Sequence, residues 1–386
     1  MANSFSALNP TNFMPMVQDF LNAMMVAKAI SRTEFRAQLK SGSTIDFPYV
    51  TDLRVQDYTT GTDLTIDANT ATSDTMSIDQ SRAATFTLGP NEIAQMEDKS
   101  LQAKYARQAA YRISNDIDQK LFTAGVNGAD GTVAGGALTS STILQYLTEA
   151  RATLVNANGA DGPLYAVLDP DRIALLAQAF IANGFGQADA SLLNGFQGRA
   201  VGFDVYESVN LPTSATLTMA TNPTADDTVT IKGVTFTFKA TPSNAGEVDV
   251  GTDAATSQTN LRNAVNGTGT PGATSYIALS TANRRKLTNA GVSMGAWATN
   301  AAVVTAYGKQ ANSETFTATA DGWGTETSQA LVGRKGATSL GLQIEPTMYE
   351  GKEPKRPETN FIIHTLFGTK VFNQDTFRLC KLTHNM

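Results

Sequence analysis

The stretch Gly42-Ser43-Thr44-Ile45-Asp46-Phe47-Pro48 sets the character of the first part of the chain. Ile45 and Phe47 alternate with polar residues, which is the period of a β-strand with one apolar face. Three further short strands are predicted, at residues 64–66, 76–78 and 84–88. The run 67–75 has almost no aliphatic side chains. Residues 42–88 therefore predict a long β-ribbon with too few apolar residues for a core of its own, which must be disordered or lie against something else.

A long helix is predicted after the ribbon, from about residue 100 to residue 124. Apolar residues recur at every fourth position, at Leu101, Tyr105, Ala109, Ile113, Ile117 and Leu121. At 1.5 Å per residue such a helix is about 36 Å long. Gly125 is a residue type that often ends helices. The opposite face carries charges and is expected to be solvated; they are Lys104, Arg107, Arg112, Asp116 and Lys120.

Residues 1–37, before the ribbon, are predicted to form an arm. A helical period runs from Val17 to Lys28, and methionines gather on the apolar side, at Met14, Met16, Met24 and Met25. Methionine is flexible and adapts to irregular surfaces. Two interpretations stay open: a helix packed on its own domain, or an arm that lies on a neighbouring subunit.

A mixed α/β section is predicted after the helix. Residues 125–136 are expected to be a Gly-rich loop, and Ser141 is a candidate N-cap for a following helix. The apolar run 164–168 predicts a buried strand. Asp169-Pro170 then predicts the start of a helix, because Asp is a good N-cap and Pro suits the first turn.

From about Thr213 to Ser339 the composition shifts to Thr, Ala, Asn and Gly. Alternating strands at 228–232 and 234–239 flank Gly233 and predict a hairpin. Further elements are predicted as strands at 248–250, 302–307 and 314–318 and as helices at 253–265 and 280–290. This set of strands and helices has its own apolar residues, so an inserted α+β domain is expected.

The composition excludes several classes of protein. The chain has 386 residues, a net charge of −6, 17% charged residues, one cysteine and two histidines. Cys380 alone cannot build a disulfide framework or a Cys-based zinc site. No apolar stretch predicts a membrane span or a signal peptide, and no basic stripe predicts sequence-specific binding to nucleic acid.

Few residues suggest chemistry. Gly291-Val292-Ser293-Met294-Gly295 matches the nucleophile elbow, but the polar, helical sequence before it favours a Gly-rich turn over a hydrolase using Ser293. The other candidates have simpler structural interpretations; they are His364, Cys380, the pair Asp226-Asp227, the glycosylation pattern at Asn266, Trp297 and Trp323. We therefore expect no enzyme, no catalytic residue, no cofactor and no metal site.

Several stretches and their order resemble the major capsid (coat) proteins of tailed bacteriophages, which share the Hong Kong 97 capsid fold. The stretches are 40–48, 76–80 with 86–88, 115–118, 201–212 and 367–371; the closest is Val201-Gly202-Phe203-Asp204-Val205-Tyr206-Glu207-Ser208-Val209-Asn210-Leu211-Pro212. They span about two thirds of the chain. The insertion departs from this pattern and resembles a small module of several phage structural proteins, at 233–238, 248–251 and 260–266.

The resemblance implies an α+β chain with a defined domain order. The parts are an N-terminal arm (1–37), an extended β-ribbon loop (38–90), a peripheral domain with a spine helix (91–136), an axial domain (137–212 and 340–350), an insertion domain (213–339) and closing strands of the peripheral domain (351–386). It also implies hexamers and pentamers that form an icosahedral head around double-stranded DNA. Expected partners are further copies of the chain, a scaffolding protein, a portal and possible decoration proteins, without a membrane. The expected location is the virion capsid, assembled in the cytoplasm of the bacterial host. The alternative is another virion part, such as a tail-tube or decoration protein.

Overall fold

The computed structural model describes residues 25–33, 42–50, 55–66, 71–89, 101–182, 198–352 and 358–385. The chain divides into two compact units. Unit 1 comprises residues 1–130, 157–162 and 334–379, and unit 2 comprises residues 131–156, 163–333 and 380–386. The predicted α+β class is confirmed, because both units combine helices with sheets.

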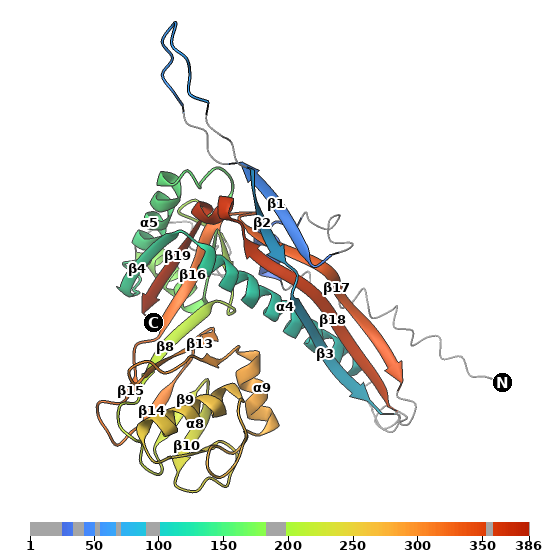
Figure 1. Cartoon of the computed structure of the whole chain (residues 1–386), viewed down its shortest axis with the longest axis vertical. Coiled ribbons are helices and arrows are strands. Elements are labelled where there is room, and N and C mark those ends of the chain that lie inside the picture. Colours follow the sequence, from blue (N-terminus) through green and yellow to red (C-terminus); the bar gives the residue numbers. More distant parts are fainter. Residues whose placement is uncertain are drawn as a thin grey trace, which may run out of the picture. The chain divides into compact units, whose positions relative to one another are not determined.

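Unit 1 is built on a three-stranded antiparallel sheet covered by one long helix (Figure 1). The strand order is β17 (Thr338–Lys352), β18 (Thr359–Val371), β3 (Gln80–Leu88). The helix α4 (Leu101–Gly128) packs on it through aromatic side chains. The Phe86 ring stacks on Phe361 of β18, with centroids 4.9 Å apart, and on Tyr105 of α4, at 5.6 Å.

The long helix is confirmed, but its predicted end at Gly125 is wrong, because α4 continues to Gly128. Phe122 and Val126 are buried and extend the apolar stripe past that glycine. Burial of these side chains offsets the cost of one glycine within a helix, about 1 kcal/mol.

The predicted ribbon is confirmed where residues 44–50 pair with residues 71–77. Strand β1 (Thr44–Val50) pairs antiparallel with β2 (Ala71–Ser77), in a register that joins Thr44 to Ser77 and Val50 to Ala71. Strand β3 follows directly. The strand predicted at 64–66 is wrong, because Leu64 and Ile66 are exposed and no strand in the described part of the chain pairs with them. Residues 71–75 of the polar run supply most of β2, since pairing needs only backbone groups.

Unit 2 contains a ten-stranded mixed sheet in the order β12-β13-β8-β16-β5-β7-β6, with β15 on β8 and β19 bridging β16 and β4. The strands are β4 (Gly131–Ala137), β5 (Leu164–Leu168), β6 (Arg199–Ala200), β7 (Phe203–Glu207), β8 (Pro212–Thr218), β12 (Ser293–Met294), β13 (Ala301–Tyr307), β15 (Gly322–Trp323), β16 (Thr327–Arg334) and β19 (Leu379–Asn385). Two helices, α5 (Ile143–Asn156) and α6 (Pro170–Ala182), belong to the same unit.

Two predictions about this section have opposite outcomes. The Asp169 cap is confirmed, since its Oδ1 accepts a hydrogen bond from the Arg172 N–H at 2.7 Å. The loop predicted at 125–136 is wrong, because Gly131–Ala137 forms β4, which pairs in parallel with β19. Glycine and alanine give no strand pattern, so this strand is ordered by its partner's backbone.

The predicted insertion holds a second, four-stranded sheet, ordered β11-β10-β9-β14. Its elements are β9 (Thr228–Ile231), β10 (Val234–Lys239), β11 (Glu247–Asp249), β14 (Ser313–Thr315), α8 (Ala254–Asn266) and α9 (Thr281–Asn289). The predicted hairpin around Gly233 is confirmed by the antiparallel pairing of β9 and β10. Phe236 and Phe238 point into a core shared with Leu261 of α8 and Leu287 of α9.

The insertion also contributes to the larger sheet. Strand β13, from the region predicted as insertion, pairs with β8 along its whole length, and β16 lies next to β5 in the strand order. Residues 340–350 pair with β18 in unit 1, and β19 pairs with β4 in unit 2. The two compact units thus group these segments differently from the domain scheme of the resemblance, whose boundaries stay a prediction. Within the described ranges no helix is both long and apolar enough to cross a membrane.

Candidate assembly surfaces

The root of the ribbon, which consists of the paired strands β1 and β2, is fixed to the remainder of unit 1 by a small buried cluster. Ile45 and Met76 face inward from the two strands and pack with Ile78 and Phe372. The Phe47 ring stacks on Phe372 with centroids 5.0 Å apart. Gly368 allows the close approach, because a Cβ there would clash with the backbone oxygen of Ser77. The base of the ribbon is therefore packed against the remainder of unit 1.

One buried carboxylate reinforces this root. Asp74 of β2 is 7% exposed, accepts a hydrogen bond from Lys370 of β18, and accepts another from the Asn373 N–H at 2.9 Å. Burial works to raise the pKa of Asp74, but these hydrogen bonds and the charge of Lys370 outweigh it and hold the pKa below the ordinary 3.8. No local pattern in the sequence indicates this pair, since 296 positions separate its members.

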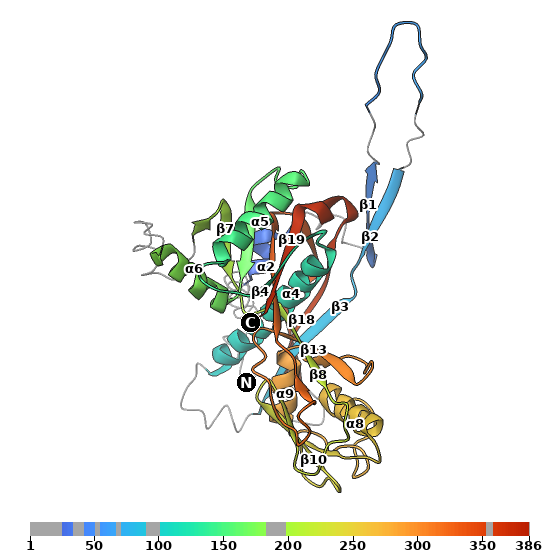
Figure 2. The same cartoon turned by 90° about the vertical axis from the view of Figure 1, so that its left-hand side faces the viewer.

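The loop at the tip of the ribbon carries exposed apolar side chains. Val55 is 99% exposed, Ile66 93%, Tyr58 66% and Leu64 53%. The Gln56 side chain donates to the Thr65 carbonyl at 2.7 Å, and a turn closes where the Thr62 N–H donates to the Thr59 carbonyl. Figure 2 shows residues 55–66 as an open loop of two extended segments. Four large, exposed apolar side chains within twelve residues make the tip a candidate contact site, because exposed apolar patches mark interaction surfaces.

The described end of the predicted arm binds its own unit. Helix α2 (Val26–Ile30) is capped from the spine helix, where Asp118 accepts a hydrogen bond from the Ala27 N–H at 2.9 Å. Ile30 is buried, and Arg32 forms a parallel bridge with Ser339 of β17. These contacts favour packing on the same chain for residues 25–33. The remainder of the Met-rich stretch, including Met14, Met16 and Met24, lies outside the described residues.

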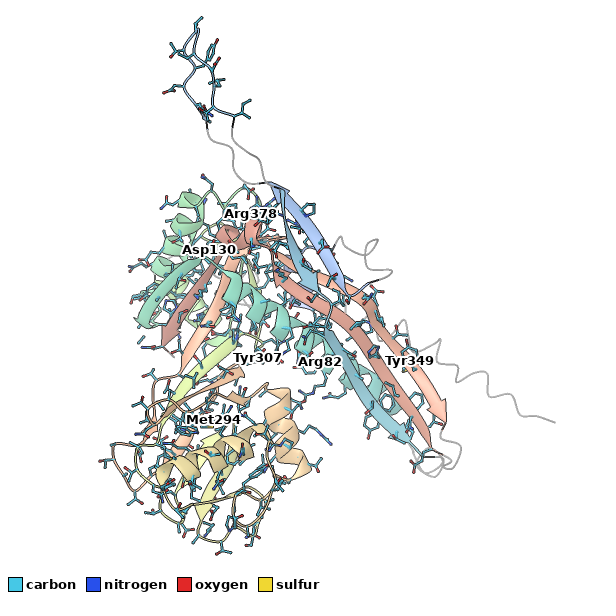
Figure 3. The ribbon with its side chains drawn as sticks, in the orientation of Figure 1. Arg82, Asp130, Met294, Tyr307, Tyr349 and Arg378 are labelled. Carbon is cyan, nitrogen blue, oxygen red and sulfur yellow. The ribbon has the colours of Figure 1, made fainter. Side chains whose placement is uncertain are left out.

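The sheet of unit 1 is also held by charge. Arg82 of β3, labelled in Figure 3, donates to Asp116 of α4 at 2.9 Å. Asp116 therefore belongs to an ion pair, whereas we expected a solvated residue. Tyr349 of β17, also labelled, is half-exposed. The Arg82 and Asp116 side chains are both partly open to solvent, so their ion pair contributes about 1 kcal/mol at most to the stability of the fold.

The insertion is fastened to the larger sheet by a lysine. The Lys232 Nζ donates to the carbonyl oxygens of Tyr307, Gly308 and Lys309, at 2.7, 2.9 and 2.6 Å. Burial lowers the pKa of Lys232, with opposition from the charge of Glu326. One ammonium thus satisfies three backbone acceptors where β13 ends. No sequence motif indicates that Lys232 binds these carbonyl groups.

The residues that the sequence offered as candidates for catalysis do not form an active site. Ser293 is exposed on the short strand β12, which pairs antiparallel with β13, and no helix follows it as an elbow requires. His364 is half-buried on β18, as expected, and lies 3.0 Å from the Ser81 hydroxyl. Burial raises the pKa of the Cys380 thiol to about 11, so it is unreactive at neutral pH.

The remaining candidates have structural roles. Asp226 pairs with Lys239, and Asp227 accepts hydrogen bonds from Thr224 and Thr317. Asn266 binds both backbone groups of Met294 at 2.9 Å. Trp297 and Trp323 pack on the insertion core, as expected. Across the described part of the chain, no three His, Cys, Asp or Glu side chains gather as a metal site.

Comparisons with known proteins give the fold. No family model and no curated protein matches the sequence. Among solved structures, a chain described as Mycobacterium phage Che8 is 14% identical, with a TM-score of 0.56, covering 93% of this chain and 90% of its own. A chain from the capsid structure of the cyanophage P-SCSP1u is also 14% identical, with a TM-score of 0.52, covering 92% and 86%.

The similarity covers both compact units and nearly the whole of each matched chain. The fold implied by the resemblance is therefore confirmed: this chain has the fold of phage capsid chains, with the ribbon and spine helix of the Hong Kong 97 type.

Proposed function

We propose that this chain is the major capsid protein of a tailed bacteriophage. In this role it assembles into hexamers and pentamers, and these form an icosahedral head that encloses double-stranded DNA. The observation that carries the proposal is the ribbon: a root packed on unit 1 and a tip whose apolar side chains are exposed on a single copy. Such side chains gain free energy only when another surface covers them.

Assembly through several surfaces is consistent with this role. Permanent assemblies bury about 2,000–5,000 Å² per interface, which favours contacts through several surfaces of each subunit. Repeated contacts between different faces close into rings. The net charge of −6 suits a container whose DNA is confined and not tightly bound. We further propose the virion capsid as its location, assembly in the bacterial cytoplasm, no catalytic activity, and a scaffolding protein, a portal and possible decoration proteins as partners.

Electron microscopy of the purified full-length protein, alone and with a co-expressed scaffolding protein, tests the proposal. Closed shells or isolated rings of five and six subunits are expected. Rings that stack into tubes would favour the alternative, a tail-tube protein. A strictly monomeric protein under all these conditions would contradict the proposal.

A paired set of variants connects assembly to the ribbon tip. Val55→Ser combined with Ile66→Ser removes the two most exposed apolar side chains of the tip. Val155→Ser removes a half-exposed aliphatic side chain from α5 and is the matched control. We expect the tip variant to lose shells while the control keeps them. Normal shells from the tip variant would refute the role of the tip.

A further inference from the structure

His384 occupies an unusual place in unit 2. It lies in β19 near the end of the chain and is 1% exposed. Both ring nitrogens lack a hydrogen-bond partner among the described residues. Buried polar atoms are normally bonded, so an unbonded buried imidazole calls for an explanation. The ring is tolerated there only in its neutral form, since burying an unpaired charge is far more costly.

The ring is part of the contact that fixes the C-terminal strand. Its centroid lies 4.2 Å from that of Tyr146 on α5. In the parallel pairing of β19 with β4 its register partner is Gly135, and a Cβ at Gly135 would clash with the Tyr146 hydroxyl. Figure 1 shows β19 and β4 side by side with α5. The imidazole thus packs where a strand, a glycine and an aromatic ring meet.

The charged groups that act on His384 come from α5, from α6 and from the residue before α6. From α6 and the residue before it, Arg172 and Asp169 form a buried ion pair that also binds Ser328 of β16. Glu149 of α5 acts on the ring electrostatically. The other charged residues on these elements are Arg151 of α5, Asp171 of α6, which pairs with Lys309, Arg334 of β16, which pairs with Asp161, and Lys381 of β19. Strand β4 carries no charge.

The balance of these groups opposes protonation. Burial and then the charge of Arg172 lower the pKa of His384 from 6.5 to about 4, against weaker opposition from Asp169 and Glu149. A histidine with a lowered pKa binds fewer protons when folded than when unfolded. Its contribution to stability is therefore complete above pH 6.5 and declines as the pH falls from 6.5 toward 4.

We propose that His384 makes the C-terminal strand β19 an acid-releasable latch. The neutral ring lets β19 dock between β4 and β16 and against α5, and protonation adds a second positive charge within the electrostatic influence of Arg172 at a buried position and drives the strand off. The consequence is local: β19 and β4 open first, before the remainder of unit 2.

The experiment uses the full-length protein and two variants, His384→Phe and His364→Phe. These are the only histidines, so the second variant is a matched control. Urea unfolding is measured from pH 7 to 4.5. Between pH 6 and 4.5, we expect the folding equilibrium constant of the wild type to fall up to tenfold per pH unit more steeply than that of His384→Phe. His364→Phe should follow the wild type.

Hydrogen exchange at pH 7 and pH 5, corrected for the chemical rate, locates the opening. In the wild type, we expect protection to fall in peptides from 131–137 and 379–385 and to persist in His384→Phe. Equal pH dependence in wild type and His384→Phe, or a loss of protection spread evenly over unit 2, would overturn the proposal.

If His384→Phe fails to fold, nuclear magnetic resonance of the wild type with labelled histidine decides. One ring signal should keep its neutral position down to pH 5 while the protein stays folded. Two ring signals that both titrate with midpoints above pH 6 would overturn the proposal.

Discussion

The ribbon and the insertion are both polar, threonine-rich regions, yet they differ in how many of their apolar side chains are buried. In the insertion, Phe236 and Phe238 alternate with threonines on β10, and helices α8 and α9 cover the buried side. In the ribbon, the apolar face ends after a few residues, and the tip leaves Val55 and Ile66 in solvent. The alternation of apolar residues, more than overall polarity, decides which region buries a core and which leaves apolar side chains exposed.

The largest effect is expected in the insertion core. Phe236→Ala removes a fully buried ring and should lower the free energy of unfolding by about 3–5 kcal/mol. Thr235→Ala, on the exposed side of the same strand, is the control and should have little effect. Urea unfolding measures both. Equal, small losses for the two variants would show that the insertion has no core of its own.

A smaller loss is expected at the ribbon root. Met76→Ala should cost about 2–3 kcal/mol, the lower part of the usual range, because its cluster is small. Ser77→Ala changes the neighbouring exposed residue and is the control. Proteolysis should cut residues 42–88 faster in Met76→Ala alone. An uncut Met76→Ala variant would mean that the root is held by other contacts.

The next effect separates charge from packing at the same root. Asp74→Asn weakens the bond to Lys370 and should cost about 1–3 kcal/mol at pH 7. Because the folded pKa of Asp74 lies below 3.8, its contribution is complete above that pH and is lost as acid titrates the carboxylate below it.

The difference between wild type and Asp74→Asn should therefore shrink below about pH 4 in thermal melting. Asp79→Asn, at an exposed site, is the control. A difference that stays constant down to pH 2 would show that the carboxylate charge is not what stabilises the root.

The same comparison explains which parts of the fold could be predicted from the sequence. Periodic segments were predictable: the spine helix, the hairpin around Gly233 and the Asp169 cap each depend on local spacing. Strand β4 was not, since glycine and alanine give no pattern and β19 supplies its order from a distant part of the chain. Leu64–Ile66 has the composition of a strand but pairs with no strand among the described residues.

The candidate surface shows the same limit. The sequence predicted that the ribbon lacks a core. It did not predict the pairing of Asp74 with Lys370, because hydrogen bonds between distant segments leave no local spacing to detect. Nor did it show which apolar residues of the ribbon are buried and which are exposed, since Ile45 and Ile66 have the same side chain and opposite environments.

The smallest effect on subunit stability is expected at the tip, and it is the sharpest test of the comparison. Val55→Ser with Ile66→Ser should change the free energy of unfolding of the dissociated subunit by no more than about 0.5 kcal/mol, because neither side chain is buried in a single copy. The loss of these side chains should weaken the association of subunits without changing the stability of a single subunit. Unfolding is measured at a concentration where light scattering detects monomers alone. A destabilisation of 2 kcal/mol or more, of the order expected at the root, would mean that the tip folds back on its own subunit, and the contrast between the two regions would then fail.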